Sequence, residues 1–130
     1  MEHILAPISA GELIDKITIL RIKLEKLTAV AKLDNVRHEL DQLMAIRTRA
    51  ALDFDGLVPC EEQLLRINRE LWQVEDDLRR REHARDFGPS FVELARSVYK
   101  LNDERSAVKK RINQVTDSAI VEEKSYASYQ

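Results

Sequence analysis

The residues best placed to do chemistry are polar side chains that interrupt otherwise apolar helical seams. Arg105 is the clearest case, because it falls at a seam position between Leu101 and Val108. A charge buried without a partner is costly, so such a residue requires a charged neighbour or a ligand. Candidate members of a shared site, on the expected first and fourth helices and in the C-terminal tail, are Asp15, Lys16, Lys23, Asn102, Asp103, Arg105, Lys109, Asn113, Lys124 and Tyr126.

Two interpretations of these polar residues are open. In the first, they form a lattice of ion pairs that fixes the register of the helices, as polar seam residues do in coiled coils. In the second, they line a groove for an anionic small molecule that is held by the four cations Lys16, Lys23, Arg105 and Lys109. Tyr126 from the tail would then close the groove.

Several kinds of site are disfavoured by the spacing of the residues. A di-metal site in a helical bundle uses Glu-x-x-His pairs, but His38 follows Asn35 and His83 follows Arg80 at that spacing. Three histidines leave little choice for a catalytic triad, and three isolated glycines cannot build a phosphate-binding loop. We therefore expect no metal and no cofactor, and we can name no catalytic residue.

The charge balance also limits the partners. The chain has 21 basic and 23 acidic residues and a net charge of −2, so it has no overall attraction for nucleic acid or an anionic membrane. The basic clusters at residues 79–81 and 109–111 lie near acidic side chains and are typical of a solvated helix face. No apolar stretch could span a bilayer, the first residues do not form a signal peptide, and Cys60 is the one cysteine. We expect a cytoplasmic protein that binds no nucleic acid.

Four helices must position the candidate residues. Apolar residues recur at steps of three and four over residues 9–27, 29–52, 61–84 and 90–117, and the tail at 118–130 has no such stripe. Ser9 and Glu12 have the spacing of a capping box, and Thr28 can cap the second helix. Gly56 and Pro59 predict a loop at 53–59. The broad apolar arc of the first helix predicts a central position in contact with more than one neighbour.

These elements predict an all-α fold in a single domain at 1–130. The expected architecture is an antiparallel four-helix bundle, or paired long helical hairpins with coiled-coil-like seams. Short connections favour an up-down-up-down order of the helices, and an intertwined dimer of hairpins is an alternative.

Two strings in the chain resemble a known family. GELIDKITILRIK at residues 11–23 and EEKSY at residues 122–126 are similar to a family of uncharacterised bacterial proteins that is classified only as a domain of unknown function. The resemblance covers the whole chain and implies a bacterial origin and a helical fold, with no assigned activity. Similar segments in longer bacterial proteins suggest a context of surface-polysaccharide metabolism. Arg21, Lys23, Arg47 and Arg49 resemble the cationic residues of helical chorismate mutases only in part.

We therefore expect a non-enzymatic interaction or accessory module that self-associates or docks on a protein partner. The regular seams on all four helices and the lack of a recognisable catalytic set favour this function. The alternative is a binder or enzyme for an anionic small molecule, such as a nucleotide sugar or a carboxylate of surface-polysaccharide metabolism.

Overall fold

A computed structural model describes residues 1–130 and contains no strand. It has four α-helices and one 3-10 turn, with these bounds: α1 Ala10–Lys26, α2 Val30–Arg49, η1 Asp55–Leu57, α3 Val58–His83 and α4 Pro89–Val115. The prediction of an all-α fold with four packed helices is confirmed.

The helix starts follow local capping chemistry, with two corrections to the sequence prediction. Ser9 caps α1, since its Oγ accepts a hydrogen bond from the Glu12 backbone N–H at 3.0 Å. Thr28 does not cap α2; Ala29 holds that position without a side-chain bond. The third helix begins at Val58 rather than at 61, because Pro59 lies in the first turn, where no backbone N–H is needed.

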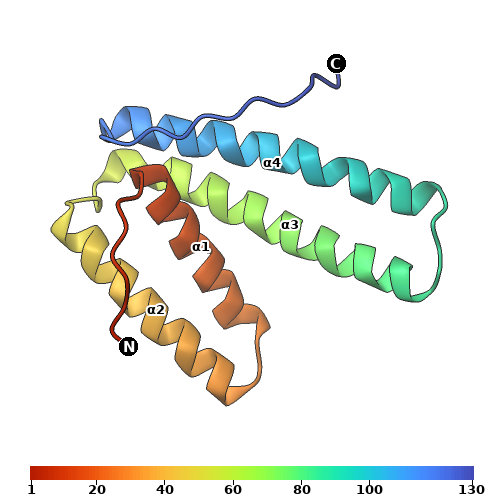
Figure 1. Ribbon diagram of the computed structural model, residues 1–130, viewed down its shortest axis with the longest axis horizontal. Helices are drawn as coiled ribbons and strands as arrows, with labels where there is room; N and C mark the ends of the chain where they lie inside the picture. The colour runs from red at the N-terminus through yellow and green to blue at the C-terminus, as the bar shows by residue number, and fades with distance from the viewer.

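The helices form two antiparallel hairpins that diverge from a common end (Figure 1). Helices α3 and α4 make the longer hairpin, and α1 and α2 make the shorter one. As its broad apolar arc predicts, α1 is central and packs on α2, α3 and α4. Helix α2 packs along α1 alone, so the four helices do not form the closed up-down-up-down ring; its buried surface is too small for two neighbours. The paired-hairpin form of the predicted fold is the one adopted.

The hydrophobic core lies at the end where the hairpins meet. Its buried side chains come from α1, η1, the first half of α3 and the second half of α4, and include Leu13, Ile14, Ile17, Leu57, Leu64, Ile67, Leu101, Val108 and Ile112. No residue of α3 after Asn68 and no residue of α4 before Leu101 is buried. We call residues 71–100, which make up this free end of the long hairpin, the distal hairpin.

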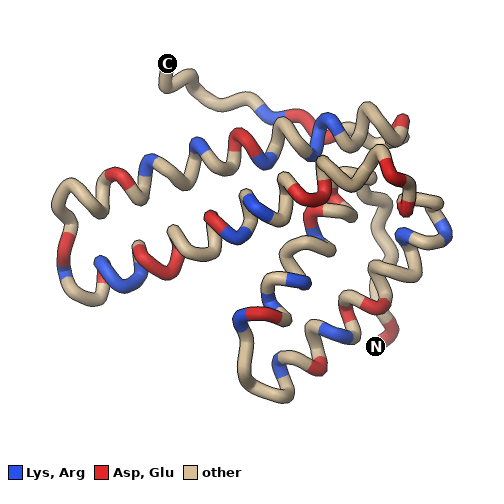
Figure 2. Tube along the Cα trace, turned by 180° about the vertical axis from the view of Figure 1, so that it is seen from behind, with Lys and Arg blue, Asp and Glu red and all other residues tan.

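Charged residues of both signs are spread over every helix (Figure 2). On α3 they also form blocks, with an acidic block at residues 75–77 followed by a basic block at residues 79–81. The tail after α4 runs back along that helix without forming one of its own (Figure 1). None of the four helices combines the length and the apolar character that a bilayer crossing requires.

Candidate functional site

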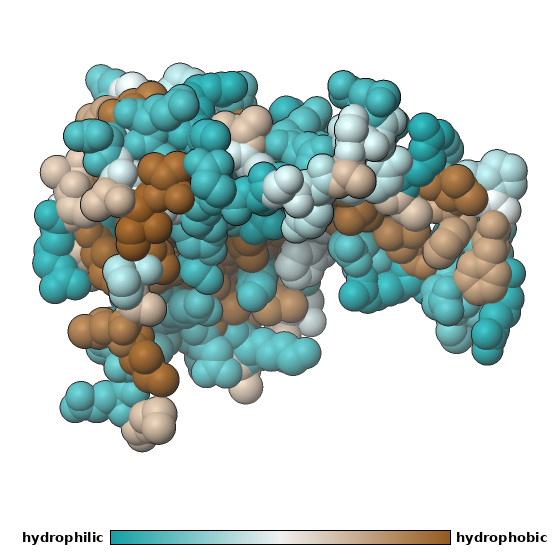
Figure 3. Space-filling model, turned by 45° about the horizontal axis from the view of Figure 1, so that its top comes forward, coloured by the Kyte–Doolittle hydropathy of each residue, from teal (hydrophilic) through white to brown (hydrophobic).

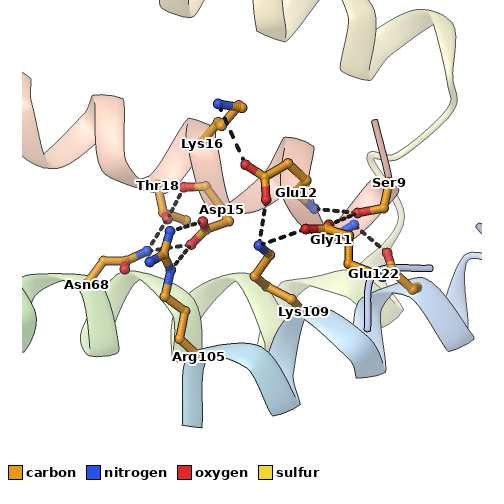
Figure 4. A network of polar contacts seen from close by, with 11 residues as sticks. Ser9, Gly11, Glu12, Asp15, Lys16, Thr18, Asn68, Arg105, Lys109 and Glu122 are labelled. Atoms are coloured by element: carbon orange, nitrogen blue, oxygen red, sulfur yellow. Dashed lines mark hydrogen bonds and ion pairs between the residues drawn. The ribbon is translucent and has the colours of Figure 1, made fainter. Parts of the chain in front are cut away.

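A buried ion pair joins α1 to α4 at the centre of the molecule (Figure 4). The Asp15 carboxylate is 0% exposed and accepts hydrogen bonds from Arg105 through Nε, at 2.9 Å, and through Nη2. This hydrogen bonding raises the pKa of Arg105, against the opposing effect of burial. The seam charge predicted at Arg105 is therefore compensated by a carboxylate of the same chain.

Asn68 and Thr18 complete the shell around this carboxylate. The Asn68 amide donates to Asp15 Oδ1 and to Thr18 Oγ1, each at 2.9 Å, and the Thr18 hydroxyl donates to the Asp15 backbone carbonyl at 2.7 Å. No buried side-chain nitrogen or oxygen lacks a partner. Our sequence reasoning missed both residues, because Asn68 flanks an α3 seam that runs unbroken through Leu64, Ile67 and Leu71 and so gives no interruption of the kind that identified Arg105.

The first turn of α1 lies against the last turns of α4. The Gly11 N–H donates to Asn113 Oδ1 at 2.7 Å, and a Cβ on Gly11 would lie 2.5 Å from the Lys109 carbonyl oxygen. Only glycine permits this approach. Lys109 Nζ lies 2.5 Å from Glu12 Oε2, so Glu12 pairs with α4 and does not return to the cap, as a complete capping box requires.

The tail is attached beside the same contact. Ser9 Oγ donates to Glu122 Oε1 at 2.7 Å, while Lys109 Nζ lies 3.7 Å from the other oxygen of Glu122. Further along the tail, Lys124 Nζ bonds Asp103 Oδ1 at 2.9 Å. That bond lowers the pKa of Asp103.

A groove of about 780 Å³ lies between α4 and the tail. Its lining includes six of the predicted site residues, namely Asn102, Asp103, Arg105, Lys109, Lys124 and Tyr126. The rings of Tyr99 and Tyr129 also line it and pack with their centroids 5.0 Å apart. Burial, followed by a hydrogen bond to Asp103, raises the pKa of Tyr129. All three tyrosines of the chain line this one groove.

The predicted cations do not converge on a common point. Lys16 is exposed and lies 3.6 Å from Glu12. Lys23 lies in the last turn of α1, half-buried, and its ammonium makes no hydrogen bond or ion pair. Arg105, Lys109 and Lys124 each bond a carboxylate within the chain, as described above. The arrangement thus holds helices and tail in register, with positive and negative groups balanced.

Glu61 forms a second ion-pair cluster, where the end of α2 meets the start of α3. Its oxygens accept from Arg47 at 2.9 and 2.6 Å and from Arg21 at 3.3 Å. The bond to Arg47 lowers the pKa of Glu61. Arg21 and Arg47 both bind Glu61, but Lys23 does not. The cations that resemble those of chorismate mutases in part therefore do not form a shared cationic pocket. Our sequence reasoning missed this cluster, although Arg47 falls at a seam position of α2, four residues after Leu43.

The distal hairpin presents apolar side chains that no third helix covers. Trp72, Leu78 and Leu94 are half-buried, and Phe87 and Val92 are 48% and 49% exposed. Figure 3 shows hydrophobic surface among polar groups at this end of the molecule. Where α1 diverges from the hairpin, a hollow of about 630 Å³ opens, lined by residues of both that include Ile19, Ile22, Trp72, Asp76 and Arg79.

One family model matches almost the whole chain. Residues 4–129 match the model of DUF6165, described as a family of unknown function. The chain belongs to DUF6165. No curated protein and no solved structure matches it. The resemblance inferred from residues 11–23 and 122–126 is thereby confirmed at the level of the family.

This DUF6165 chain therefore offers two regions for function. One is the polar network with its tail groove, in which every buried polar atom is already paired. The other is the distal hairpin, whose apolar side chains lack cover. No group of three or more His, Cys, Asp or Glu side chains is placed to hold a metal ion.

Proposed function

We propose that this chain is a non-enzymatic interaction module that docks on another protein chain through its distal hairpin. One observation carries the proposal: a hairpin with a regular apolar seam has no buried residue over its entire distal half. Apolar surface of this kind, with a polar rim, is typical of a protein–protein interaction site.

The distal half has no buried residue because two helices alone cannot enclose the side chains between them. In the proximal half, α1 lies across α3 and α4 and completes a core in which Leu64 and Ile112 are 0% exposed. Leu71 still packs against this core, but farther along the seam continues through Leu78 and Leu94, where nothing takes the place of the third helix. A helical partner that packed there would bury these side chains and stabilise the complex.

The docking face is the side of the distal hairpin that continues the face on which α1 packs. Trp72, Asp76 and Arg79 follow one another at steps of four and three on α3, and all three line the hollow next to α1. The opposite side of the hairpin is lined mostly by polar residues such as Asp77, Arg80 and Glu93, with Leu94 beside them. We place the docking face on the side toward α1 because Trp72 and Leu71, the apolar residues of α3 that line the hollow, lie there.

Site-specific photo-crosslinking in cells that express the chain tests this function. A photo-reactive amino acid at Ala95, in the distal hairpin, is expected to give a discrete crosslinked product. The same group at Val30, which is 73% exposed on α2, serves as the control and is expected to give none. Adding Leu78→Asp to the Ala95 variant should abolish its crosslinked product, and the Val30 variant should still give none. Equal labelling from both positions, or labelling that Leu78→Asp leaves unchanged, would contradict the proposal.

A second candidate function is binding of a small anionic ligand in the groove between α4 and the tail. The specific observation is that the Asn102 amide and the Ser106 hydroxyl line the groove and make no hydrogen bond within the chain. With three tyrosines beside them, they offer hydrogen bonds and ring surfaces to a ligand of ordinary pocket size. Because the cations in the groove are already paired, this function ranks second.

A thermal-shift screen against nucleotide sugars, phosphosugars and dicarboxylates tests the second candidate. A ligand at a hundred times its Kd stabilises the fold by about 2.7 kcal/mol. The shift should disappear in Asn102→Ala and persist in Lys23→Ala, which alters a cation outside the groove. A shift that both variants keep, or no shift with any compound, would remove this candidate.

A further inference from the structure

We propose that the chain docked on the distal hairpin is a second copy of this same chain, packed antiparallel about a two-fold axis near Leu78. This inference rests on the proposed function and names its partner. Each copy would place its distal hairpin in the open angle between the two hairpins of the other (Figure 1). The four helices of the two distal hairpins would then form an antiparallel bundle.

The charges along α3 favour this arrangement because they are self-complementary. The acidic block at residues 75–77 lies directly before the basic block at residues 79–81, with Leu78 between them. A two-fold axis near Leu78 would reverse the direction of the second α3, so that each acidic block would lie opposite a basic block. A parallel pairing in the same register would instead bring like charges together.

Three of these charged residues, Glu75, Asp76 and Arg79, line the hollow on the docking face. Asp76 lines the hollow beside α1 and has no ion-pair partner within the chain. Arg79 lines the same hollow and pairs only with Glu75, at 2.5 Å, where the two side chains are 73% and 47% exposed. Such exposed pairs on one helix contribute little and exchange readily for a partner in an interface. In the two-fold arrangement, Asp76 of each copy meets Arg79 of the other.

The overall charge permits self-association as well. A net charge of −2 spread over 130 residues gives little repulsion between copies. The half-buried Leu78 lies at the axis, where it would meet its own counterpart, whereas Trp72 would meet the end of the partner copy's α3. An isologous contact needs only one such surface, and the chain supplies it.

A charge-swap experiment on the purified full-length chain tests the inference. We expect sedimentation equilibrium to give a dimer for the unchanged chain. Asp76→Arg and Arg79→Asp, each alone, place like charges opposite one another twice in the dimer, and each should weaken dimerisation by about tenfold or more. An equimolar mixture of the two variants should restore a heterodimer, because both contacts regain opposite charges.

Arg66→Asp is the matched control, because Arg66 is an exposed arginine of α3 that pairs with Glu70 in the proximal half. It makes the same change of charge as Arg79→Asp and should leave the dimer unchanged. Circular dichroism should show equal helix content in all variants, since Arg66 and Arg79 are exposed and Asp76 is only half-buried.

The outcomes separate this inference from the function on which it rests. Recovery of the dimer in the mixture alone supports the two-fold arrangement. A dimer that neither swap weakens overturns the arrangement near Leu78 and leaves the docking function in place. A purified chain that stays monomeric, together with a crosslink from Ala95 to a different protein, overturns self-association and retains the docking function. A monomer with no crosslink overturns both.

Discussion

The proximal and distal halves of the α3–α4 hairpin carry the same kind of seam in different surroundings. In the proximal half, Leu64 and Ile67 are 0% and 1% exposed, whereas Leu71 and Leu78, at equivalent seam positions, are only half-buried. The two halves have similar helical periodicity, and both are well formed. They differ in the presence of α1, which covers the proximal half and diverges before the distal half.

This difference separates two contributions that helical proteins usually combine. Periodicity decides which side chains face the neighbouring helix, and both halves satisfy it. Burial needs a third element, because two helices leave each other's seam open at the sides. The proximal half is therefore a folding core, and the distal half is a surface available for docking.

The largest effect should come from breaking the polar network that ties α1 to the proximal half. Asp15→Leu leaves Arg105 without its counter-charge and should lower the free energy of unfolding by about 3–5 kcal/mol. Urea denaturation measures this loss of stability. The double variant Asp15→Leu with Arg105→Met removes both charges and should recover much of the loss. A double variant as unstable as Asp15→Leu would show that the cost comes from lost packing and not from the unpaired charge.

A matched pair of leucine substitutions tests the comparison directly. Leu64→Ala creates a cavity in the proximal core and should cost about 2–5 kcal/mol. Leu78→Ala, the same change on the same helix, should cost about 1 kcal/mol in dilute solution, because Leu78 is already partly exposed. Equal losses in urea denaturation would show that the distal half has a core of its own. At high protein concentration, Leu78→Ala should also weaken the proposed dimer.

Two glycine substitutions sharpen the same comparison. At Gly11 a Cβ would lie 2.5 Å from the Lys109 carbonyl oxygen, so Gly11→Ala should force α1 away from α4 and cost about 1–3 kcal/mol. At Gly88, in the distal loop, a Cβ meets only Asp86 Oδ1, at the ordinary distance of 3.4 Å, so Gly88→Ala should have little effect. Thermal unfolding measures both. A stable Gly11→Ala variant would mean that the contact of α1 with α4 adjusts easily.

The smallest effect concerns the tail, which lies on α4 outside both seams. The pKa of Asp103 is lowered by its bond to Lys124, so this contact is fully present above the ordinary value of 3.8 and is lost as the pH falls through the lower folded value. Acidification should therefore separate Tyr129 from Tyr99, as judged by nuclear Overhauser contacts between the rings. Lys124→Met should weaken those contacts already at neutral pH. Rings that stay packed in this variant would show that the ion pair does not hold the tail.

Part of the polar network could be predicted from sequence because it disturbs a pattern. Arg105 interrupts the seam of α4, and that interruption led to Asp15 as a candidate partner. Arg47 falls at the next position of the α2 seam, four residues after Leu43, and could have been found by the same reasoning. Asn68 and Glu61 could not, because neither interrupts a seam. Glu61 meets Arg47 where the end of α2 reaches the start of α3. Lys23 was predicted as a site residue and lies apart from the others, since spacing on one helix does not fix the distance to another.

The sequence by itself determined the four helices, their apolar faces and the polar residues that interrupt them, because these depend on contacts between residues three or four apart. It also determined the order of acidic and basic blocks on α3. Only the tertiary structure decided that α2 packs along α1 and not along α3. It also decided that α1 covers half of the long hairpin and that the tail lies along α4. These features depend on the angles at which helices cross and on contacts between residues up to 113 positions apart, such as that of Ser9 with Glu122. Local periodicity carries no information about either.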